Sequence, residues 1–294
     1  MEIHFEIENK CLLKCRHCSS CASSCGQKMD YAVSDMVSFL NKLKGTKEIY
    51  LTGGEPLLYP EIVVLLKHLH REVEGVSIGM FTAGIMGSAE RLEPISEEYA
   101  EQLACSGLKV CYLSVYSCIK EEHDWMTNVE GAFDLTRVSI SHLKKAGIDV
   151  RFNSVITSRN QGQLPELIEM AKVYGATEVR LLKLINHGRA EACWDIIGIN
   201  EDQYRYAVMT ILQRENPVRI TASGVVDLIS CRPFCGKDTC PAGKQLWYIT
   251  YCGDIYPCAS VKNQMHYKVG NIKDDIDTAR EGFHKLLDGE VLCK

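Results

Sequence analysis

The chain has 294 residues, 46% of them hydrophobic and 24% charged, which is enough for one large domain or for one domain with an appendage. Its 38 acidic and 33 basic residues give a formal charge of -5, so we expect no binding of nucleic acid or of an anionic membrane surface. No apolar run approaches the ~18 residues of a membrane span, and the first ten residues carry acids where a signal peptide carries bases. We therefore expect a cytoplasmic protein.

Strand-like runs alternate with amphipathic helical patterns over the first part of the chain. The expected strands are 3–7, 47–52, 76–82, 109–116, 149–157 and 177–185. The expected helices lie near 32–44, 61–72, 97–106, 130–145, 163–174 and 200–214. Glycines follow several of these patterns, as in "KKAGI" and "VYGAT", where a helix is expected to stop. The alternation predicts an α/β fold with a parallel sheet, rolled or open, and with functional loops at the carboxyl ends of the strands.

Cysteine is unusually frequent, with 15 residues in the chain. Because disulfides are rare in the cytoplasm, metal ligation is the leading explanation for the excess. Cys11, Cys15 and Cys18 form a CxxxCxxC pattern directly after the first expected strand. Structural zinc usually takes two ligand pairs and leaves no open position, whereas three thiolates can bind three corners of a [4Fe–4S] cube. We therefore predict a cluster whose fourth iron is open and reactive.

The segment "LTGGEP" follows the second expected strand and contains Gly53, Gly54, Glu55 and Pro56. Since the carboxyl ends of neighbouring parallel strands meet at one edge of the sheet, this turn should lie beside the cysteine triple. Adjacent glycines let the backbone approach a ligand closely, and the following Glu and Pro keep the turn from becoming a helix. Alone the segment is a common turn, but beside the cysteines it is typical of half a binding site.

With these two motifs the chain resembles the radical S-adenosylmethionine (SAM) enzymes. The resemblance implies a partial (β/α)6 barrel of TIM type, in which Cys11, Cys15 and Cys18 hold a [4Fe–4S] cluster. It implies that SAM chelates the open iron through its amino and carboxylate groups, while the "GGEP" turn receives the amino group. Reductive cleavage of SAM would then yield methionine and a 5′-deoxyadenosyl radical that abstracts a hydrogen atom from the substrate.

Further candidate contacts to SAM follow from the same resemblance. Ser114 or Ser117, in "YLSVYS", is the candidate hydroxyl in the family's pattern, and Asn153 is a candidate for the ribose or methionine portion. Arg189 in "HGRA" is a candidate partner of the SAM carboxylate through a bidentate fork, although a solvated arginine is the alternative. His17 stands where the family usually has an aromatic residue, and it can stack near adenine or titrate. "FTAG" departs from the family, which commonly has asparagine before the glycine.

A second group of cysteines lies near the end of the chain. Cys240, Gly253 and Cys258 have the spacing C-x12-G-x4-C, and "QLWYIT" and "IYPC" alternate as two strands of a hairpin that turns at "CGD". This pattern resembles the start of the superfamily's auxiliary-cluster module, called SPASM when it holds two clusters and twitch when it holds one. The resemblance implies a radical SAM barrel over residues 1–222 and a twitch-like or shortened SPASM-like domain, a β-hairpin plus a helix, over residues 223–294.

The thiols near the end are sufficient for one auxiliary [4Fe–4S] cluster, which makes two clusters in all. The expected ligands are Cys235, Cys240, Cys258 and Cys293. Cys231 could replace Cys235, and the alternative is a zinc knuckle formed by "CRPFCGKDTC". The roles of Cys21, Cys25 and Cys252 stay open. A cluster with four protein thiolates has no open iron, which favours electron transfer and therefore net oxidation of the substrate.

The segment "SVYSCIKEEHDWMTNVEGAFDLTRVSISHLKKAGIDVRFNSVITSRN" is similar to SPASM-bearing enzymes that modify peptides. The likeness is carried by His123, Asp124, Thr127, Gly131 and Phe133. We therefore expect crosslinking, dehydrogenation or epimerisation of a ribosomally made peptide, with a flavodoxin- or ferredoxin-type reductant. Only ten residues precede the cysteine triple, so we expect a separate leader-binding protein or direct capture in the barrel mouth.

Two other functions remain open at this stage. The first is radical dehydrogenation of a small molecule such as a sugar alcohol or an amino-cyclitol. The second is a zinc-stabilised binding module without enzymatic activity. Oxidation of a serine or cysteine side chain is not expected, because Ala259 follows Cys258 where relatives with that activity carry an aspartate base.

Overall fold

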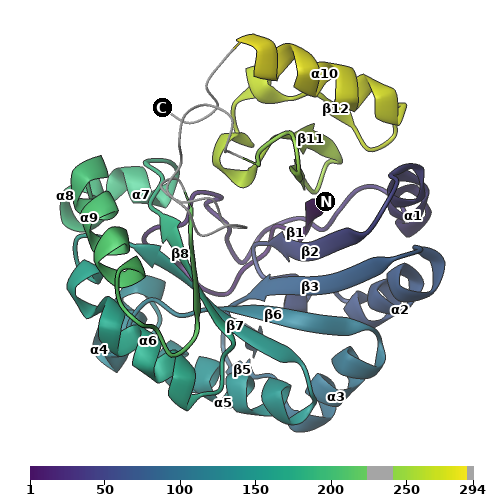
Figure 1. Ribbon diagram of the computed structural model, residues 1–294. Helices are drawn as coiled ribbons and strands as arrows, with labels where there is room; N and C mark the ends of the chain where they lie inside the picture. Colours follow the sequence, from purple (N-terminus) through teal and green to yellow (C-terminus); the bar gives the residue numbers. More distant parts are fainter. Residues whose placement is uncertain (224–240, 290–294) are drawn as a thin grey trace.

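The computed structural model describes residues 1–223 and 241–289, and its main feature is a sheet with six neighbouring parallel strands (Figure 1). Their order is β1-β2-β3-β6-β7-β8. Their bounds are Glu2–Glu8 for β1, Lys47–Gly53 for β2, Val76–Thr82 for β3, Leu108–Ser114 for β6, Asp149–Ile156 for β7 and Glu178–Lys183 for β8. All six predicted strands are therefore confirmed, with ends that differ by at most two residues.

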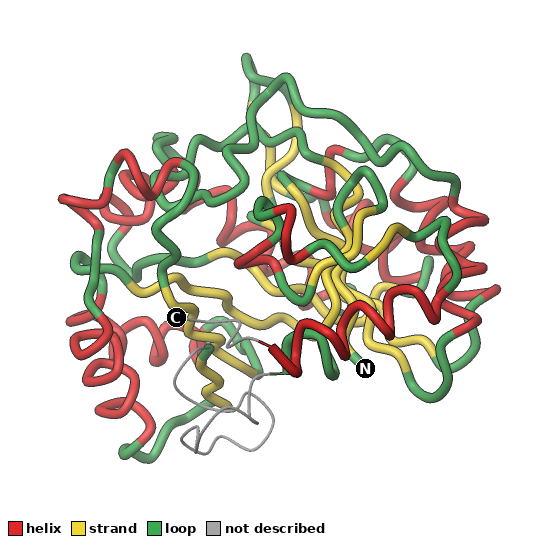
Figure 2. Tube along the Cα trace, turned by 90° about the horizontal axis from the view of Figure 1, so that it is seen from above, coloured by secondary structure: helices red, strands yellow, loops and turns green. Residues whose placement is uncertain are grey.

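The predicted helices surround the sheet, and each buries its apolar face in the core of the protein. They are α1 (Val33–Lys42), α2 (Ile62–Glu72), α3 (Glu97–Cys105), α5 (Ala132–Lys145), α6 (Leu164–Val173) and α9 (Glu201–Leu212). Gly147 and Gly175, with φ of 79° and 68°, stand after α5 and α6 in the left-handed region that ends a helix, as predicted. Figure 2 shows the strands in the middle of the molecule and helices around them. The arrangement is the predicted partial barrel.

Several elements without a long periodic pattern were not predicted. They are the hairpin β4 (Ile85–Gly87) and β5 (Leu92–Pro94), the helices α4 (Lys120–Thr127), α7 (Arg189–Ala192) and α8 (Trp194–Ile197), and the strand β9 (Arg219–Ala222). Short 3-10 turns lie at Pro56–Leu58, Gln161–Gln163, Ala259–Val261 and Met265–Tyr267. None of these elements is longer than eight residues, so its hydrophobic periodicity is a weak signal. Among the described residues, no helix is long and apolar enough to cross a membrane.

The predicted C-terminal hairpin is present and extends the main sheet. β10 (Leu246–Ile249) pairs antiparallel with β11 (Asp254–Tyr256), and β12 (Gly270–Asn271) and the helix α10 (Ile276–Gly289) follow. β10 also pairs in parallel with β1, in a register that runs from Glu2–Leu246 to Phe5–Ile249. Figure 1 accordingly places the hairpin beside β1. This continuity was not anticipated, and the domain boundary at residues 222 and 223 stays a prediction.

Alternate residues of the parallel strands point into the barrel, where they form a buried polar layer at its amino end. The guanidinium of Arg180 donates to the Tyr112 hydroxyl at 2.8 Å, and the Glu178 carboxylate accepts from the Thr221 hydroxyl at 2.7 Å. The Tyr112 hydroxyl also donates to Glu178 at 3.2 Å. These groups bind one another at the amino end of the barrel, and the loops available for chemistry lie at the carboxyl end of the strands.

Candidate functional site

The cysteine loop, defined here as residues 9–28, follows β1 and carries the three predicted cluster ligands. Burial, together with the charges of Glu55 and Cys18, raises the pKa of the Cys11 thiol to about 12. Burial, Cys11 and Cys18 likewise raise the pKa of Cys15 well above its ordinary value. The three thiols therefore share one electrostatic neighbourhood in which free thiolates are disfavoured. Such a donor set fits a cationic iron cluster, because the metal compensates the thiolate charges.

The described residues contain no group of three or more His, Cys, Asp or Glu side chains placed to hold a single metal ion. The side chains of Cys11, Cys15 and Cys18 therefore do not converge on one single-ion site. A four-iron cluster does not need such a convergence, since each thiolate binds a different iron of the cube.

The C-terminal end of helix α4, which was not predicted, is hydrogen-bonded to the cysteine loop. The backbone N–H of Lys14 donates to Thr127 O at 3.1 Å, and that of Arg16 donates to Met126 O at 2.9 Å. The Arg16 side chain donates to Trp125 O at 3.0 Å. The loop is thereby fixed to the carboxyl end of a helix whose last carbonyl groups would otherwise lack partners.

The residues that carried the resemblance to peptide-modifying enzymes connect α4 to the start of α5. The Asp124 carboxylate accepts from the backbone N–H groups of Gly131 and Phe133, both at 2.8 Å. The Thr127 hydroxyl donates to Asp124 O at 3.0 Å, and His123 Nδ1 accepts from the Tyr116 N–H at 3.3 Å. These contacts fix the position of α4, to which the cysteine loop is bonded.

The "GGEP" turn lies against the start of the cysteine loop, as predicted. Gly54 N donates to Glu8 O at 2.6 Å, and Glu55 N donates to Lys10 O at 2.8 Å. A Cβ atom on Gly53 would lie 2.0 Å from Glu8 O, and one on Gly54 would lie 2.4 Å from Lys10 O. The glycines therefore permit a close approach between two backbone segments of the chain, in addition to the ligand approach that the sequence suggested.

The Glu55 carboxylate is buried and ties this turn to the end of β3. It accepts from the Thr82 hydroxyl at 2.5 Å, from Ala83 N at 2.8 Å and from Leu57 N at 3.2 Å. Burial raises its pKa to about 7, although these donors act in the opposite direction. Pro56 begins the 3-10 turn that follows. A contact of this turn with the amino group of SAM stays a prediction.

The change Glu55→Gln tests this anchoring role. A glutamine has one acceptor oxygen, so its NH2 group would face a backbone donor or leave one unpaired in a buried place. We expect the free energy of unfolding to fall by about 1–3 kcal/mol in denaturant titration. Glu61→Gln, an exposed change in the same segment, should stay within about 0.5 kcal/mol. Equal losses for the two variants would contradict the role of Glu55.

Ser114 and Asn153 lie opposite each other at the ends of β6 and β7. They follow the inward-pointing Tyr112 and Arg151 by two residues, so they also face the barrel interior. The Oδ1 atom of Asn153 is buried and has no hydrogen-bond partner among the described residues. Such an atom is typical of a ligand contact. The hydroxyl of Ser117 donates to Gln163 Oε1 at 2.6 Å and accepts from Ile119 N at 2.9 Å, and the Ser114 side chain is hydrogen-bonded to Tyr116. A contact of either serine with SAM stays a prediction.

His17 and Arg189 complete the set of predicted SAM contacts. The His17 ring lies 4.5 Å from the Tyr116 ring, and its buried Nδ1 has no partner among the described residues. Burial, with Arg189 and His123, lowers the His17 pKa to about 4, so the ring is neutral near pH 7. Arg189 donates from Nε to Cys15 O and from Nη1 to Ala22 O, both at 2.8 Å. It therefore positions the cysteine loop, and its contact with the SAM carboxylate stays a prediction.

The C-terminal candidates are only partly within the described residues. Cys258 is buried and stands two residues after the end of β11. Cys231, Cys235, Cys240 and Cys293 lie outside the described residues. Cys21, Cys25 and Cys252 are exposed. The auxiliary ligand set therefore stays a prediction.

Comparison with known proteins agrees with this geometry. Residues 5–171 match the family described as "Radical SAM superfamily". The chain belongs to the radical SAM superfamily. As a radical SAM enzyme it is expected to use SAM and a [4Fe–4S] cluster, which are the cofactors that the family implies.

Two curated relatives of this radical SAM enzyme have different names. An AdoMet-dependent heme synthase of Methanosarcina barkeri is 21% identical, with 99% of this chain and 85% of the relative covered. The mycofactocin maturase MftC of Mycobacterium tuberculosis is 26% identical, with 92% and 67% covered.

Two solved structures have the same fold. SuiB of Streptococcus suis bound to SAM matches with a TM-score of 0.70 at 19% identity, over 94% of this chain and 64% of SuiB. anSMEcpe with bound AdoMet and a Cp18Cys peptide matches with a TM-score of 0.72 at 17% identity, over 97% and 81%. The chain thus spans less than two thirds of the length of SuiB. The predicted partial barrel is confirmed.

Proposed function

We propose that this radical SAM enzyme binds a [4Fe–4S] cluster through Cys11, Cys15 and Cys18 and oxidatively modifies a ribosomally made peptide in the cytoplasm. The observation that carries the proposal is the buried cysteine triple, held beside the "GGEP" turn by the bonds from Gly54 N and Glu55 N. Once bound, the cluster supplies the electron for reductive cleavage of SAM, which enables removal of a hydrogen atom from the substrate.

The chain's own residues then bind and orient SAM. The backbone of Gly53 and Gly54 would receive the SAM amino group, and the unpartnered Asn153 Oδ1 would accept a hydrogen bond from the ribose or the methionine portion. Ser114 offers a hydroxyl from the neighbouring strand. The neutral ring of His17 packs near the adenine, because a protonated ring is disfavoured at this buried position.

A peptide substrate is supported by the names and complexes of the relatives. MftC is a maturase, SuiB was solved with the precursor peptide SuiA, and anSMEcpe was solved with peptides. We infer a crosslink or a dehydrogenation, which are net oxidations with loss of two hydrogens, or an epimerisation, which is redox-neutral. A separate leader-binding protein and a flavodoxin- or ferredoxin-type reductant complete the proposed system.

We also propose one auxiliary [4Fe–4S] cluster in a twitch-like domain over residues 223–294. Its ligands would be Cys235, Cys240, Cys258 and Cys293, and a fully ligated cluster there would accept the electron that remains after hydrogen removal. The buried thiol of Cys258 beside the hairpin supports this assignment. Burial of a neutral thiol costs little free energy. Burial of a charged thiolate would be compensated by a bound iron.

A second candidate function is oxidation of a small molecule. The heme synthase of Methanosarcina barkeri aligns over almost the whole chain, which favours a substrate other than a peptide. The two functions differ in their products. A mass loss of two on a co-encoded short peptide supports the first, and the same loss on a metabolite, with the peptide unchanged, supports the second.

The basic activity is tested with anaerobically reconstituted protein, SAM and dithionite. We expect a brown preparation with about eight irons per chain, as two four-iron clusters require, and formation of 5′-deoxyadenosine. A colourless preparation that contains zinc and leaves SAM intact would instead support a metal-stabilised binding module.

The change Cys258→Ala separates the two clusters. We expect a loss of about four irons per chain, retention of some SAM cleavage, and loss of modified product, because only the route for the substrate electron is removed. Iron analysis and mass spectrometry of the product measure these effects. Cys111→Ala, which removes another buried thiol, should keep both the iron and the product. Full product formation by Cys258→Ala would contradict the auxiliary cluster.

A further inference from the structure

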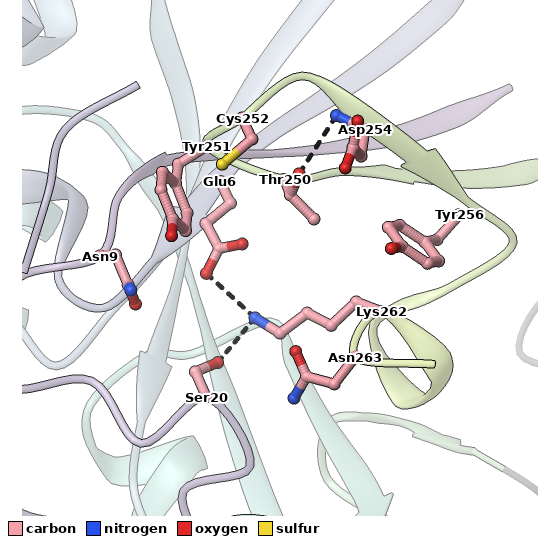
Figure 3. A pocket seen from close by; sticks show the side chains of 10 residues that line it. All are labelled: Glu6, Asn9, Ser20, Thr250, Tyr251, Cys252, Asp254, Tyr256, Lys262 and Asn263. Atoms are coloured by element: carbon pink, nitrogen blue, oxygen red, sulfur yellow. Dashed lines mark hydrogen bonds and ion pairs between the residues drawn. The ribbon is translucent and has the colours of Figure 1, made fainter. Parts of the chain in front are cut away.

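A polar pocket of about 250 Å³ lies between the cysteine loop and the C-terminal hairpin (Figure 3). Glu6, Asn9 and Ser20 line it from the barrel side, and residues within the range 250–263 line it from the other side. Glu6 belongs to β1, while Asn9 and Ser20 stand two residues before Cys11 and two residues after Cys18. The pocket is therefore at the carboxyl end of β1, next to the cluster ligands.

The inner wall of the pocket is a buried ion pair between Lys262 and Glu6. Lys262 Nζ donates to Glu6 Oε1 at 3.0 Å, to the Ser20 hydroxyl at 2.7 Å and to the Tyr248 hydroxyl at 3.1 Å. The two side chains are only 6% and 4% exposed. Desolvation makes such a pair no better for stability than apolar residues of the same size. Stability alone therefore does not explain why charges are placed here.

The pocket holds acceptors that remain available to a ligand, whereas its buried ammonium group is fully used. The three protons of Lys262 are used by three acceptors, so the ammonium has none left for a ligand. Asn9, in contrast, has a buried Oδ1 without a partner among the described residues. The carboxylates of Glu6 and Asp254 also line the pocket. The Asp254 carboxylate accepts from Lys268 at 2.7 Å and from Asn271 at 2.9 Å.

We propose that this pocket binds a hydrogen-bond-donating group of the substrate, an amide or ammonium group carried by one side chain of the peptide. The inference rests on the proposed function, because it places one part of the peptide beside the cluster site. A volume of about 250 Å³ suits a single side chain. The buried Asn9 Oδ1 and the Glu6 carboxylate accept from the donor. A carboxylate on the ligand is disfavoured, because the Lys262 ammonium has no proton left to donate to it.

The test uses the full chain with reconstituted clusters and four probe peptides, acetyl-Gly-Gly-X-Gly-Gly-amide with X as Lys, Gln, Glu or Leu. Binding is measured by isothermal titration calorimetry without reductant. We expect the Lys and Gln peptides to bind about five- to tenfold more tightly than the Glu and Leu peptides, as one added hydrogen bond in a buried site allows.

Two variants, compared with one control, test whether the preference for the Lys and Gln peptides arises in this pocket. Asn9→Leu removes an unpartnered polar atom, so it should reduce the preference to less than about twofold without lowering Tm. Asn41→Leu, the same change on α1, should leave the preference intact. Cys252→Phe, at an exposed position of the pocket wall, fills the space and should also remove the preference, and it decides the case if Asn9→Leu does not fold.

Equal binding of the four peptides, or a preference that survives both Asn9→Leu and Cys252→Phe, would overturn the inference. The formation of 5′-deoxyadenosine is measured separately. Cleavage of SAM without a peptide preference would reject this pocket and leave the proposed chemistry intact. A preference without SAM cleavage would reject the proposed chemistry and leave the binding site intact.

Discussion

Cys15→Ala should lower the formation of 5′-deoxyadenosine to the background rate. Cys15 is the most buried of the three cluster thiols, and its backbone carbonyl also receives the Arg189 side chain. Alanine leaves two thiolates for the N-terminal cluster, which do not hold a four-iron cube in place. We therefore expect the loss of about four irons per chain together with the loss of SAM cleavage, measured by iron analysis and chromatography.

The matched control is Cys105→Ala, which removes an exposed thiol from the end of α3. This variant should keep the iron content and the rate of the unchanged protein. SAM cleavage that survives in Cys15→Ala at the normal rate would show that the cluster is bound elsewhere in the chain.

Gly53→Ala should have the largest effect on folding among single changes near the site. Gly53 has φ of 138°, where an L side chain is strained, and the new Cβ would lie 2.0 Å from Glu8 O. Glu8 is the last residue of β1, so the clash cannot be relieved by rotation of a side chain. We expect the free energy of unfolding to fall by about 3 kcal/mol or more in denaturant titration.

Gly45→Ala separates the clash from the backbone strain. Gly45 also has a positive φ, of 82°, but nothing lies within 4 Å of its Cβ position. This variant should lose only about 1–2 kcal/mol, which is the cost of the left-handed conformation. Similar losses in the two variants would show that the contact between the "GGEP" turn and β1 is not tight.

The regular parts of the barrel were predictable because their hydrophobic patterns are local. Strands such as β7 alternate strictly between buried and partly exposed residues, and Gly147 and Gly175 end their helices with positive φ. The adjacency of the "GGEP" turn and the cysteine loop was also predictable, since neighbouring parallel strands end at one edge.

Other parts depend on contacts between distant segments, which no local pattern encodes. Nothing in "LWYI" indicates that β10 adds to β1, because its residues are equally suited to an independent hairpin. Helix α4 has only three buried residues, and tertiary contacts with the cysteine loop override its weak pattern. Lys262 reaches Glu6 and Ser20 because the hairpin before it pairs with β1, which is also a contact between distant segments.

The pairing of β1 with β10 has a consequence for how the protein is made. One edge of β1 joins β2, which follows soon after it in the chain, while the other edge joins β10, which is made much later. A ribosome therefore releases the cysteine loop long before its parent strand acquires its second neighbour. We expect iron insertion to follow the synthesis of β10, since until then the strand that carries the loop has an unpaired edge.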